Sequence, residues 1–180
     1  MASHAARPPG SRRLRRARAR RPRRLAGPVL ATLIAVLLAV AFWVGTDLRD
    51  AQAAADDRQA AMRAAGTHAV HLLSVGHRAV DADIGRVLAT STGAARAEYA
   101  RAAAELKRTT VAGRLLRTGA LRATGLVSLR GGTARVMVVG DELTRRDGGE
   151  DVPQERFHRW DMEVTKVGTA WLVSKVEPVP

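Results

Sequence analysis

The sequence predicts an α+β protein in which a single N-terminal transmembrane helix precedes helices packed on a curved antiparallel sheet. Three observations support this prediction. An uncharged run of 22 residues follows a basic tail, alanine-rich segments with helical spacing follow that run, and β-rich segments separated by glycine turns fill the rest. Helices first and strands afterwards are typical of domains whose helices cover one face of an antiparallel sheet.

The tail, residues 1–24, holds ten arginines and no acidic residue, and residues 25–46 carry no charge at all. As a helix, 22 residues extend roughly 33 Å, enough to cross a hydrocarbon core of ~30 Å. Positive charge keeps a short N-terminal segment on the cytoplasmic side. We therefore expect a single-pass plasma-membrane protein with a cytoplasmic N-terminus and an extracytoplasmic C-terminal domain. The tail arginines should also contact anionic lipid headgroups.

A cleavable signal sequence is the main alternative to a permanent anchor. Ala51, Gln52 and Ala53 offer the small residues that cleavage sites use. The apolar run is longer than the ~7–15 residues of a signal peptide, however, and it continues into a helical pattern. These features favour an uncleaved anchor.

The location of the charge argues against nucleic acid as a partner. The net charge is +13, but the tail accounts for ten of these units and leaves 20 basic and 17 acidic residues elsewhere. Aromatic side chains that could stack on bases make up only 3% of the chain. There is no cysteine, which excludes disulfides, thiolate nucleophiles and cysteine metal sites.

Three helices are predicted beyond the apolar run. Residues 47–76 are rich in alanine, contain no proline and should continue the membrane helix without a break. Apolar residues recur at three- to four-residue intervals in Arg78–Ala89 and again in Ala94–Leu116, with Thr92-Gly93 between them. We divide the exported part into a helical stalk and first domain helix, residues 47–75, and the remainder of the domain, residues 76–180.

The remaining residues predict an antiparallel meander. Ala120–Leu129 and Ala134–Leu143 are β-rich, and the Gly131-Gly132 pair between them supplies the positive φ angles of a tight hairpin. A polar loop is predicted at Arg145–Gln154, and Gly168 marks a turn before a last strand from Trp171 to Val176.

In the segment before that turn, inward- and outward-facing residue types alternate, as they do in a half-buried strand. His158, Trp160, Met162 and Val164 fall on one face, which should be the inner one. Trp160 and Trp171 are expected to close the core, because each lies in a strand among apolar neighbours.

Three segments in this order resemble a known family. They are Val80–Leu88 leading to Thr92-Gly93, the Ala97-Glu98-Tyr99 triplet, and Trp171–Val179. Behind an arginine tail and one membrane span, they resemble the Mce-associated membrane proteins of actinobacteria, which are accessory to the mammalian-cell-entry (Mce) lipid importers. Where relatives carry an aromatic-Asp pair this chain has Gly76-His77, and Ala94 and Ala95 replace a frequent aromatic residue.

The resemblance implies both a fold and a role. The fold is a cone like that of nuclear transport factor 2 (NTF2) and SnoaL, in which helices and a curved sheet enclose a pocket. The role is non-enzymatic support of an Mce-type lipid import complex in the cell envelope. Its partners would be the permease or substrate-binding subunits, with a lipid as an additional ligand.

The polar residues that could carry chemistry have simpler explanations. His68, His71 and His77 lie near one another in sequence, but no acidic residue at zincin spacing accompanies them, so partly buried or surface histidines are expected. Asp81 and Asp83 lie near a helix start, where they can cap the helix and interact favourably with its dipole, or else be solvated at the surface. We therefore predict no metal site.

Two alternative functions remain at the sequence level. An isomerase or hydratase of this fold would need a pocket base, and the candidates are Asp81, Asp141, His158 and Asp161, with Tyr99 as the only tyrosine. Strand alternation puts Asp161 outside the cone and His158 inside it. We predict no catalytic and no cofactor-binding residue. The second alternative is a secreted small-molecule carrier released by signal cleavage.

Overall fold

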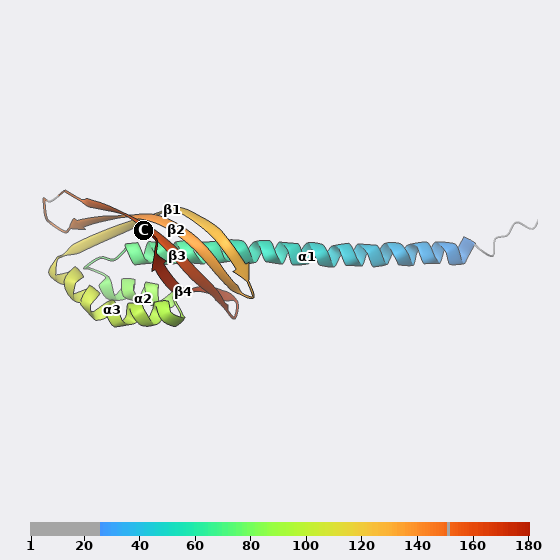
Figure 1. The fold of residues 1–180 in the computed structure, drawn as a ribbon, viewed down its shortest axis with the longest axis horizontal. Helices are drawn as coiled ribbons and strands as arrows, with labels where there is room; N and C mark the ends of the chain where they lie inside the picture. Colours follow the sequence, from blue (N-terminus) through green and yellow to red (C-terminus); the bar gives the residue numbers. More distant parts are fainter. Residues whose placement is uncertain (1–25, 151) are drawn as a thin grey trace, which may run out of the picture. The chain divides into compact units, whose positions relative to one another are not determined.

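The computed structural model describes residues 26–150 and 152–180, so the arginine tail lies outside the described residues. The described chain has the predicted α+β architecture, with three helices followed by four strands (Figure 1). The elements are α1 (Ala26–Leu73), α2 (Val80–Ala89), α3 (Gly93–Ala112), β1 (Leu115–Arg130), β2 (Thr133–Arg146), β3 (Gln154–Val167) and β4 (Ala170–Pro178).

The chain divides into two compact units, Met1–Leu48 and Arg49–Pro180. The first unit contributes the apolar part of α1, whose side chains are almost all exposed. This is the one helix of residues 26–150 and 152–180 that is long and apolar enough to cross a membrane. The expectation that the helix continues past Thr46 is confirmed, because α1 runs on to Leu73. Its single proline, Pro28, stands in the first turn, where a missing N–H costs nothing.

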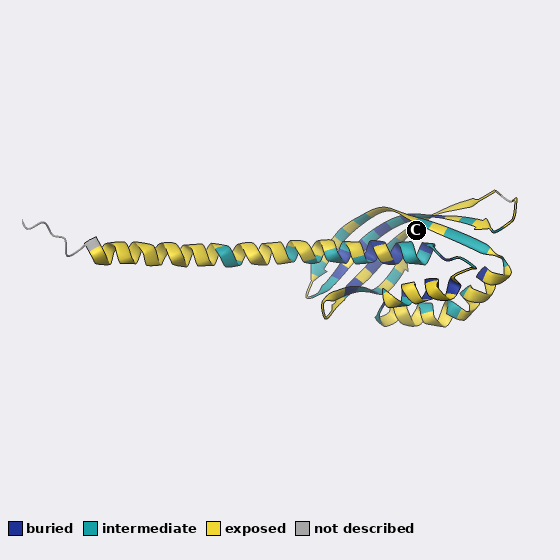
Figure 2. Cartoon of the chain, turned by 180° about the vertical axis from the view of Figure 1, so that it is seen from behind, coloured by how far each residue is buried: buried dark blue, intermediate teal, exposed yellow. Residues whose placement is uncertain are grey.

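In the second unit the last turns of α1 fill the inner face of the sheet. Ala61, Ala65 and Ala69 recur every four residues and are fully buried. They belong to one core cluster with inward-facing side chains of the strands, namely Val136, Val138, Met162, Val164, Trp171 and Val173. Figure 2 shows this burial on the end of α1 and across the sheet. Because alanine side chains are short, α1 can approach the sheet closely.

The four strands form an antiparallel meander in the order β1-β2-β3-β4. The predicted hairpin is confirmed, since Arg130 pairs with Thr133 and both glycines between them have positive φ, 54° and 79°. Gly168, with φ 62°, makes the predicted turn between β3 and β4. The register of β1 against β2 shifts twice, between Leu121 and Ala123 and between Leu126 and Ser128, so this edge strand carries two bulges.

The predicted inner face of β3 is confirmed. Met162 and Val164 are buried, and Trp160 is half-buried and packs against the core. Trp171 of β4 is 8% exposed and belongs to the same core, as expected. The strands are longer than predicted, so the predicted polar loop shrinks to residues 147–153.

The predicted third helix, Ala94–Leu116, is too long by four residues at its C-terminus. It ends at Ala112, and Gly113 and Arg114 reverse the chain, with Arg114 in the left-handed region at φ 48°. Leu115 and Leu116 then begin β1 and pair with the segment after α1: the His77 N–H donates to the Leu115 carbonyl at 2.9 Å. The second helix likewise begins two residues later than predicted, at Val80.

Leu73, the last residue of α1, packs its side chain against two glycines of the sheet. Leu73 is 2% exposed, and a Cβ added at Gly119 of β1 would lie only 2.1 Å from its Cβ. A Cβ added at Gly140 of β2 would lie 2.8 Å from the Leu73 Cδ1. The sheet thus leaves room for Leu73 only because both strands lack a side chain there.

We predict that Gly119→Ala destabilises the protein by about 1–3 kcal/mol, the usual cost of overpacking a core. The matched control is Gly125→Ala in the same strand, where an added Cβ meets nothing within 4 Å. Urea unfolding of the purified full-length protein in detergent, followed by tryptophan fluorescence, measures both changes. Equal midpoints for the two variants would contradict the packing assigned to Leu73.

Candidate functional site

The three histidines near the end of α1 lie in different surroundings. His68 is 1% exposed, and its Nδ1 lies 2.8 Å from the Thr90 hydroxyl. Burial, helped by the nearby His71, lowers the pKa of His68 to about 4, so the ring is neutral at neutral pH. His71 is half-buried, and His77 contacts Asp147 instead. Within residues 26–150 and 152–180, no three His, Cys, Asp or Glu side chains converge as a metal site requires.

Of the two roles expected for Asp81 and Asp83, capping is wrong for both, and surface solvation holds for Asp81 but not for the buried Asp83. The residue before α2 is Ala79, and no side chain caps this helix. Asp83 is buried, accepts a hydrogen bond from the Gly76 N–H at 2.8 Å and pairs with Arg86, because the chain after α1 folds back over it. Asp81 is exposed and pairs with Lys107 of α3 at 2.7 Å. Both residues do lie in the first turn of α2, where negative charge favours the helix dipole.

The other carboxylates considered as catalytic bases lie on the outer face of the sheet. Asp141 pairs with Arg122 at 2.6 Å, and Asp161 accepts a hydrogen bond from Arg135 Nε, also at 2.6 Å. The predicted outward position of Asp161 is therefore confirmed. Neither carboxylate shares a face with His158.

A different carboxylate, Glu142 of β2, accompanies His158 on the inner face. Glu142 is 8% exposed, and its Oε1 accepts a hydrogen bond from the Thr144 hydroxyl at 2.6 Å. His158 Nε2 lies 3.7 Å from Oε2, and Arg117 Nε lies 3.8 Å from Oε1. Neither nitrogen has a hydrogen-bond partner among the described residues, although both atoms are buried. At these separations the three side chains are within the range of an ion pair but form no hydrogen bond with one another.

The position of His158 is fixed by stacking on Trp160, with ring centroids 5.1 Å apart and an interplanar angle of 15°. Sequence reasoning placed this histidine inside correctly but missed Glu142. The signal was present, because Val136, Val138, Gly140 and Glu142 alternate in one phase of β2. The cluster brings one acidic and two basic side chains together on the inner face, with no direct hydrogen bond from Glu142 to either basic group.

Tyr99 of α3 lies beside a smaller apolar cluster formed by Val75, Val80 and Ile84. Its hydroxyl is buried and has no partner among the described residues. Burial raises the pKa of Tyr99, an effect that the charge of Arg117 opposes. The hydroxyl therefore stays protonated and can donate a hydrogen bond.

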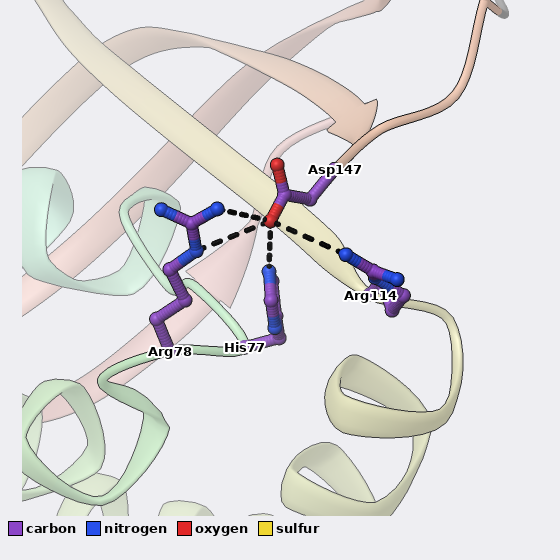
Figure 3. Close-up of polar contacts among 4 residues, drawn as sticks. All are labelled: His77, Arg78, Arg114 and Asp147. Carbon is purple, nitrogen blue, oxygen red and sulfur yellow. Dashed lines mark hydrogen bonds and ion pairs between the residues drawn. The ribbon is translucent and has the colours of Figure 1, made fainter.

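A second polar cluster joins three connections of the domain, as Figure 3 shows. Asp147 Oδ2, after β2, accepts from His77 Nε2 at 2.9 Å and from Arg78 at 2.7 and 3.1 Å. Arg114 Nη2, from the turn after α3, lies 3.9 Å from the same oxygen, and the Arg114 carbonyl accepts from the Asp147 N–H at 2.8 Å. One carboxylate thus links the segment after α1, the turn before β1 and the connection between β2 and β3.

The chain belongs to the Rv1363c/MT1408-like family, whose sequence profile matches residues 25–180. A curated relative is the uncharacterized protein Rv1363c of Mycobacterium tuberculosis, 29% identical over 126 residues. The alignment covers 68% of this chain and 48% of that protein, so the chain spans about half the length of this relative.

Several solved structures have a similar fold. The periplasmic domain of DotI has a TM-score of 0.56 at 12% identity, covering 66% of this chain and 92% of that one. An IcmL-like type IV secretion system protein of Legionella pneumophila has a TM-score of 0.54 at 9% identity, covering 66% and 89%. The VirB8 protein of Agrobacterium tumefaciens has a TM-score of 0.51 at 11% identity, covering 69% of this chain and 92% of that one. At these identities the similarity is one of fold alone.

We predict that Asp147→Asn destabilises the domain at neutral pH. His77 and Arg78 lower the pKa of Asp147 below its usual value of 3.8. A lowered folded-state pKa means that the ionised form stabilises the fold above pH 3.8, and that this contribution is lost as the pH falls through the folded-state value. The gap in melting temperature between Asp147→Asn and the unmodified chain should therefore be largest near pH 7 and close below pH 3.8.

The control for this experiment is Asp81→Asn, which removes an exposed ion pair of a kind that contributes little. Thermal melts between pH 3 and pH 7 measure both variants. A gap for Asp147→Asn that is independent of pH would show that its ion pairs do not stabilise the fold.

Proposed function

We propose that this protein is a non-enzymatic accessory protein of the cell envelope, anchored by α1, and that it supports an Mce-type lipid import complex through protein contacts. The observation that carries the proposal is the use of α1 for two purposes. Its first half is the apolar segment, and its second half fills the inner face of the sheet with Ala61, Ala65 and Ala69. Because the anchor helix is also the core helix of the domain, the domain can present its outer surface to partner proteins of the same membrane.

The distribution of polar side chains supports a non-enzymatic role. An isomerase or hydratase needs a base, an oxyanion donor and a substrate in one pocket. Asp141 and Asp161 are on the outer face, and Asp81 is paired at the surface. Of the four candidate bases, His158 alone lies on the inner face, where Glu142 and Arg117 accompany it beside the stacked ring of Trp160.

We further propose that the domain is a member of the NTF2-like group of cones. The support is architectural: α1, α2 and α3 lie on one side of a four-stranded antiparallel meander, as Figure 1 shows for the part of the chain after residue 48. The Mce link is supported by the resemblance of Val80–Leu88, Ala97–Tyr99 and Trp171–Val179 to Mce-associated proteins. The similarity to secretion-system domains adds a general precedent for domains that lie beside a membrane assembly.

The proposed topology has the arginine tail in the cytoplasm and the domain outside. Because the chain has no cysteine, one substitution creates a single thiol. We expect Thr169→Cys, in the exposed turn before β4, to react with a membrane-impermeant maleimide in intact spheroplasts. Ser3→Cys should react only after lysis. The reverse pattern would overturn the topology.

The proposed partners are tested by a mild-detergent pull-down of the tagged full-length protein from native membranes, with proteins and lipids identified by mass spectrometry. We expect recovery of importer permease or substrate-binding subunits. The matched control is the tagged fragment 1–48, which keeps the apolar helix and lacks the second unit. The same subunits on both baits would place the contact in the membrane helix. A lone full-length protein with a stoichiometric small molecule would contradict the accessory role.

A further inference from the structure

An open groove of about 490 Å³ lies between α1 and the edge strand β1. We refer to it as the α1–β1 groove. One face of α1 lines it from Gln59 to His71, about three turns or roughly 18 Å of helix. Since a water molecule occupies about 30 Å³, the groove has room for a single chain of roughly sixteen non-hydrogen atoms.

The first bulge of β1 builds the other wall of this groove. In a regular strand, residues three apart point to opposite faces of the sheet. Because Arg122 is an extra residue here, Leu121 and Thr124 both point inwards. Both side chains reach α1 at Gly66, where an added Cβ would lie 2.8 Å from Leu121 Cδ2 and 3.4 Å from Thr124 Cγ2. Gly66 thus forms the floor of the groove.

The surface of the groove is mostly apolar and is open to water. Met62 and Val70 line it from α1, and Leu121 lines it from β1. Leu121 is 41% exposed although it points to the inner side of the sheet. Covering apolar surface is favourable by about 25 cal/mol per Å². A hydrocarbon chain laid along the groove therefore gains free energy.

One charged side chain with a permanent charge lines the groove, and it is positive. Arg63 is exposed on α1, and the lining residues include no acidic side chain. Asp57, the last acidic residue before Arg63, pairs with Lys166 of β3 at 2.6 Å instead. Since a guanidinium group offers donors in a planar fork that matches a carboxylate, an arginine beside an apolar groove favours a chain that ends in a carboxylate.

Size and charge together restrict the class of ligand. Two acyl chains exceed the volume of the groove, so a diacyl phospholipid does not fit. An amine of the same chain length would be repelled by Arg63. A neutral ester would fill the groove but would leave the guanidinium group without a partner from the ligand.

We propose that the α1–β1 groove binds a long-chain fatty acid, whose carboxylate pairs with Arg63 and whose chain lies along Met62, Val70 and Leu121. Long side chains of a helix point toward its N-terminus, so the carboxylate lies at the N-terminal end of the groove. This assignment does not depend on the proposed role in a lipid import complex. The labelling test below reports the ligand, whereas the pull-down reports the protein partners.

The test uses the full-length protein in phosphatidylcholine nanodiscs and a photoreactive fatty acid of about sixteen non-hydrogen atoms that carries a diazirine in its chain. Cross-linked peptides are identified by mass spectrometry, and labelling is normalised to that of the apolar segment 26–46, which reports partition into lipid. We expect labels at residues 62–70 and 121–124. Labels confined to the apolar segment would overturn the proposal.

The role of the arginine is tested by a charge-matched pair of variants. Arg63→Gln should weaken the apparent affinity about twofold to fivefold, the usual worth of a partly exposed ion pair. The control is Arg58→Gln, which removes the same charge from an exposed position of α1 outside the groove lining. An equal loss in both variants would refute the pairing with Arg63.

Competition distinguishes the carboxylate from simple apolar binding. Myristate should displace the label about twofold to fivefold better than methyl myristate, and this preference should vanish in Arg63→Gln. Equal competition by the ester in the unmodified chain would refute the carboxylate. Stronger competition by tetradecylamine would refute the anionic class of ligand.

A groove-filling variant gives a further, independent readout. Thr67 lines the groove from an exposed position on α1, so Thr67→Trp should abolish labelling of residues 121–124 without changing the melting temperature. The control is Ala55→Trp, also exposed on α1 and outside the groove lining, which should leave labelling unchanged. Labelling of residues 121–124 that persists in Thr67→Trp would contradict the assignment. If Thr67→Trp lowers the melting temperature, the comparison of Arg63→Gln with Arg58→Gln decides.

Discussion

The close approach of α1 to the sheet is the constraint on which the rest of the domain depends. Ala61, Ala65 and Ala69 form a flat stripe on α1. The strand residues of the same core cluster are Val136, Val138, Met162 and Val164. At the C-terminal end of α1 the sheet has glycines at positions 119 and 140, and the missing side chains leave room for Leu73. Larger residues at these points would push the helix outwards and open the core. The same helix carries the apolar segment, so the packing of the domain and its attachment depend on one element.

The short-range features of the fold were predictable from the sequence. The hairpin at Gly131-Gly132 requires two positive φ angles, which glycine supplies. The alternation from His158 to Val164 has a period that only a half-buried strand explains. The continuation of the helix past Thr46 follows from alanine-rich composition without proline. Each of these predictions rests on a pattern within a few residues, and each is confirmed.

The features that were mispredicted or missed depend on residues distant in sequence. Leu115 and Leu116 fit a helical repeat equally well, and they become strand because the segment after α1 offers backbone partners. Asp83 resembles a capping residue, yet it binds the Gly76 N–H because the chain folds back over it. Glu142 was not predicted to belong to a polar cluster, because its partners Arg117 and His158 come from neighbouring strands. Two of the three segments that carry the resemblance to Mce-associated proteins also meet in space, since the Thr92 N–H donates to the Val173 carbonyl at 2.8 Å.

The two bulges of β1 have a consequence for how this domain behaves among other proteins. An edge strand with a regular row of free N–H and C=O groups recruits strands from other molecules, which leads to aggregation or domain swapping. Here the extra residues are Arg122 and Val127, and they break the row into short pieces. Arg122 also holds Asp141 across the outer face, so a charge pair stands beside the first break. The β1 edge is therefore a poor template for a strand of another molecule.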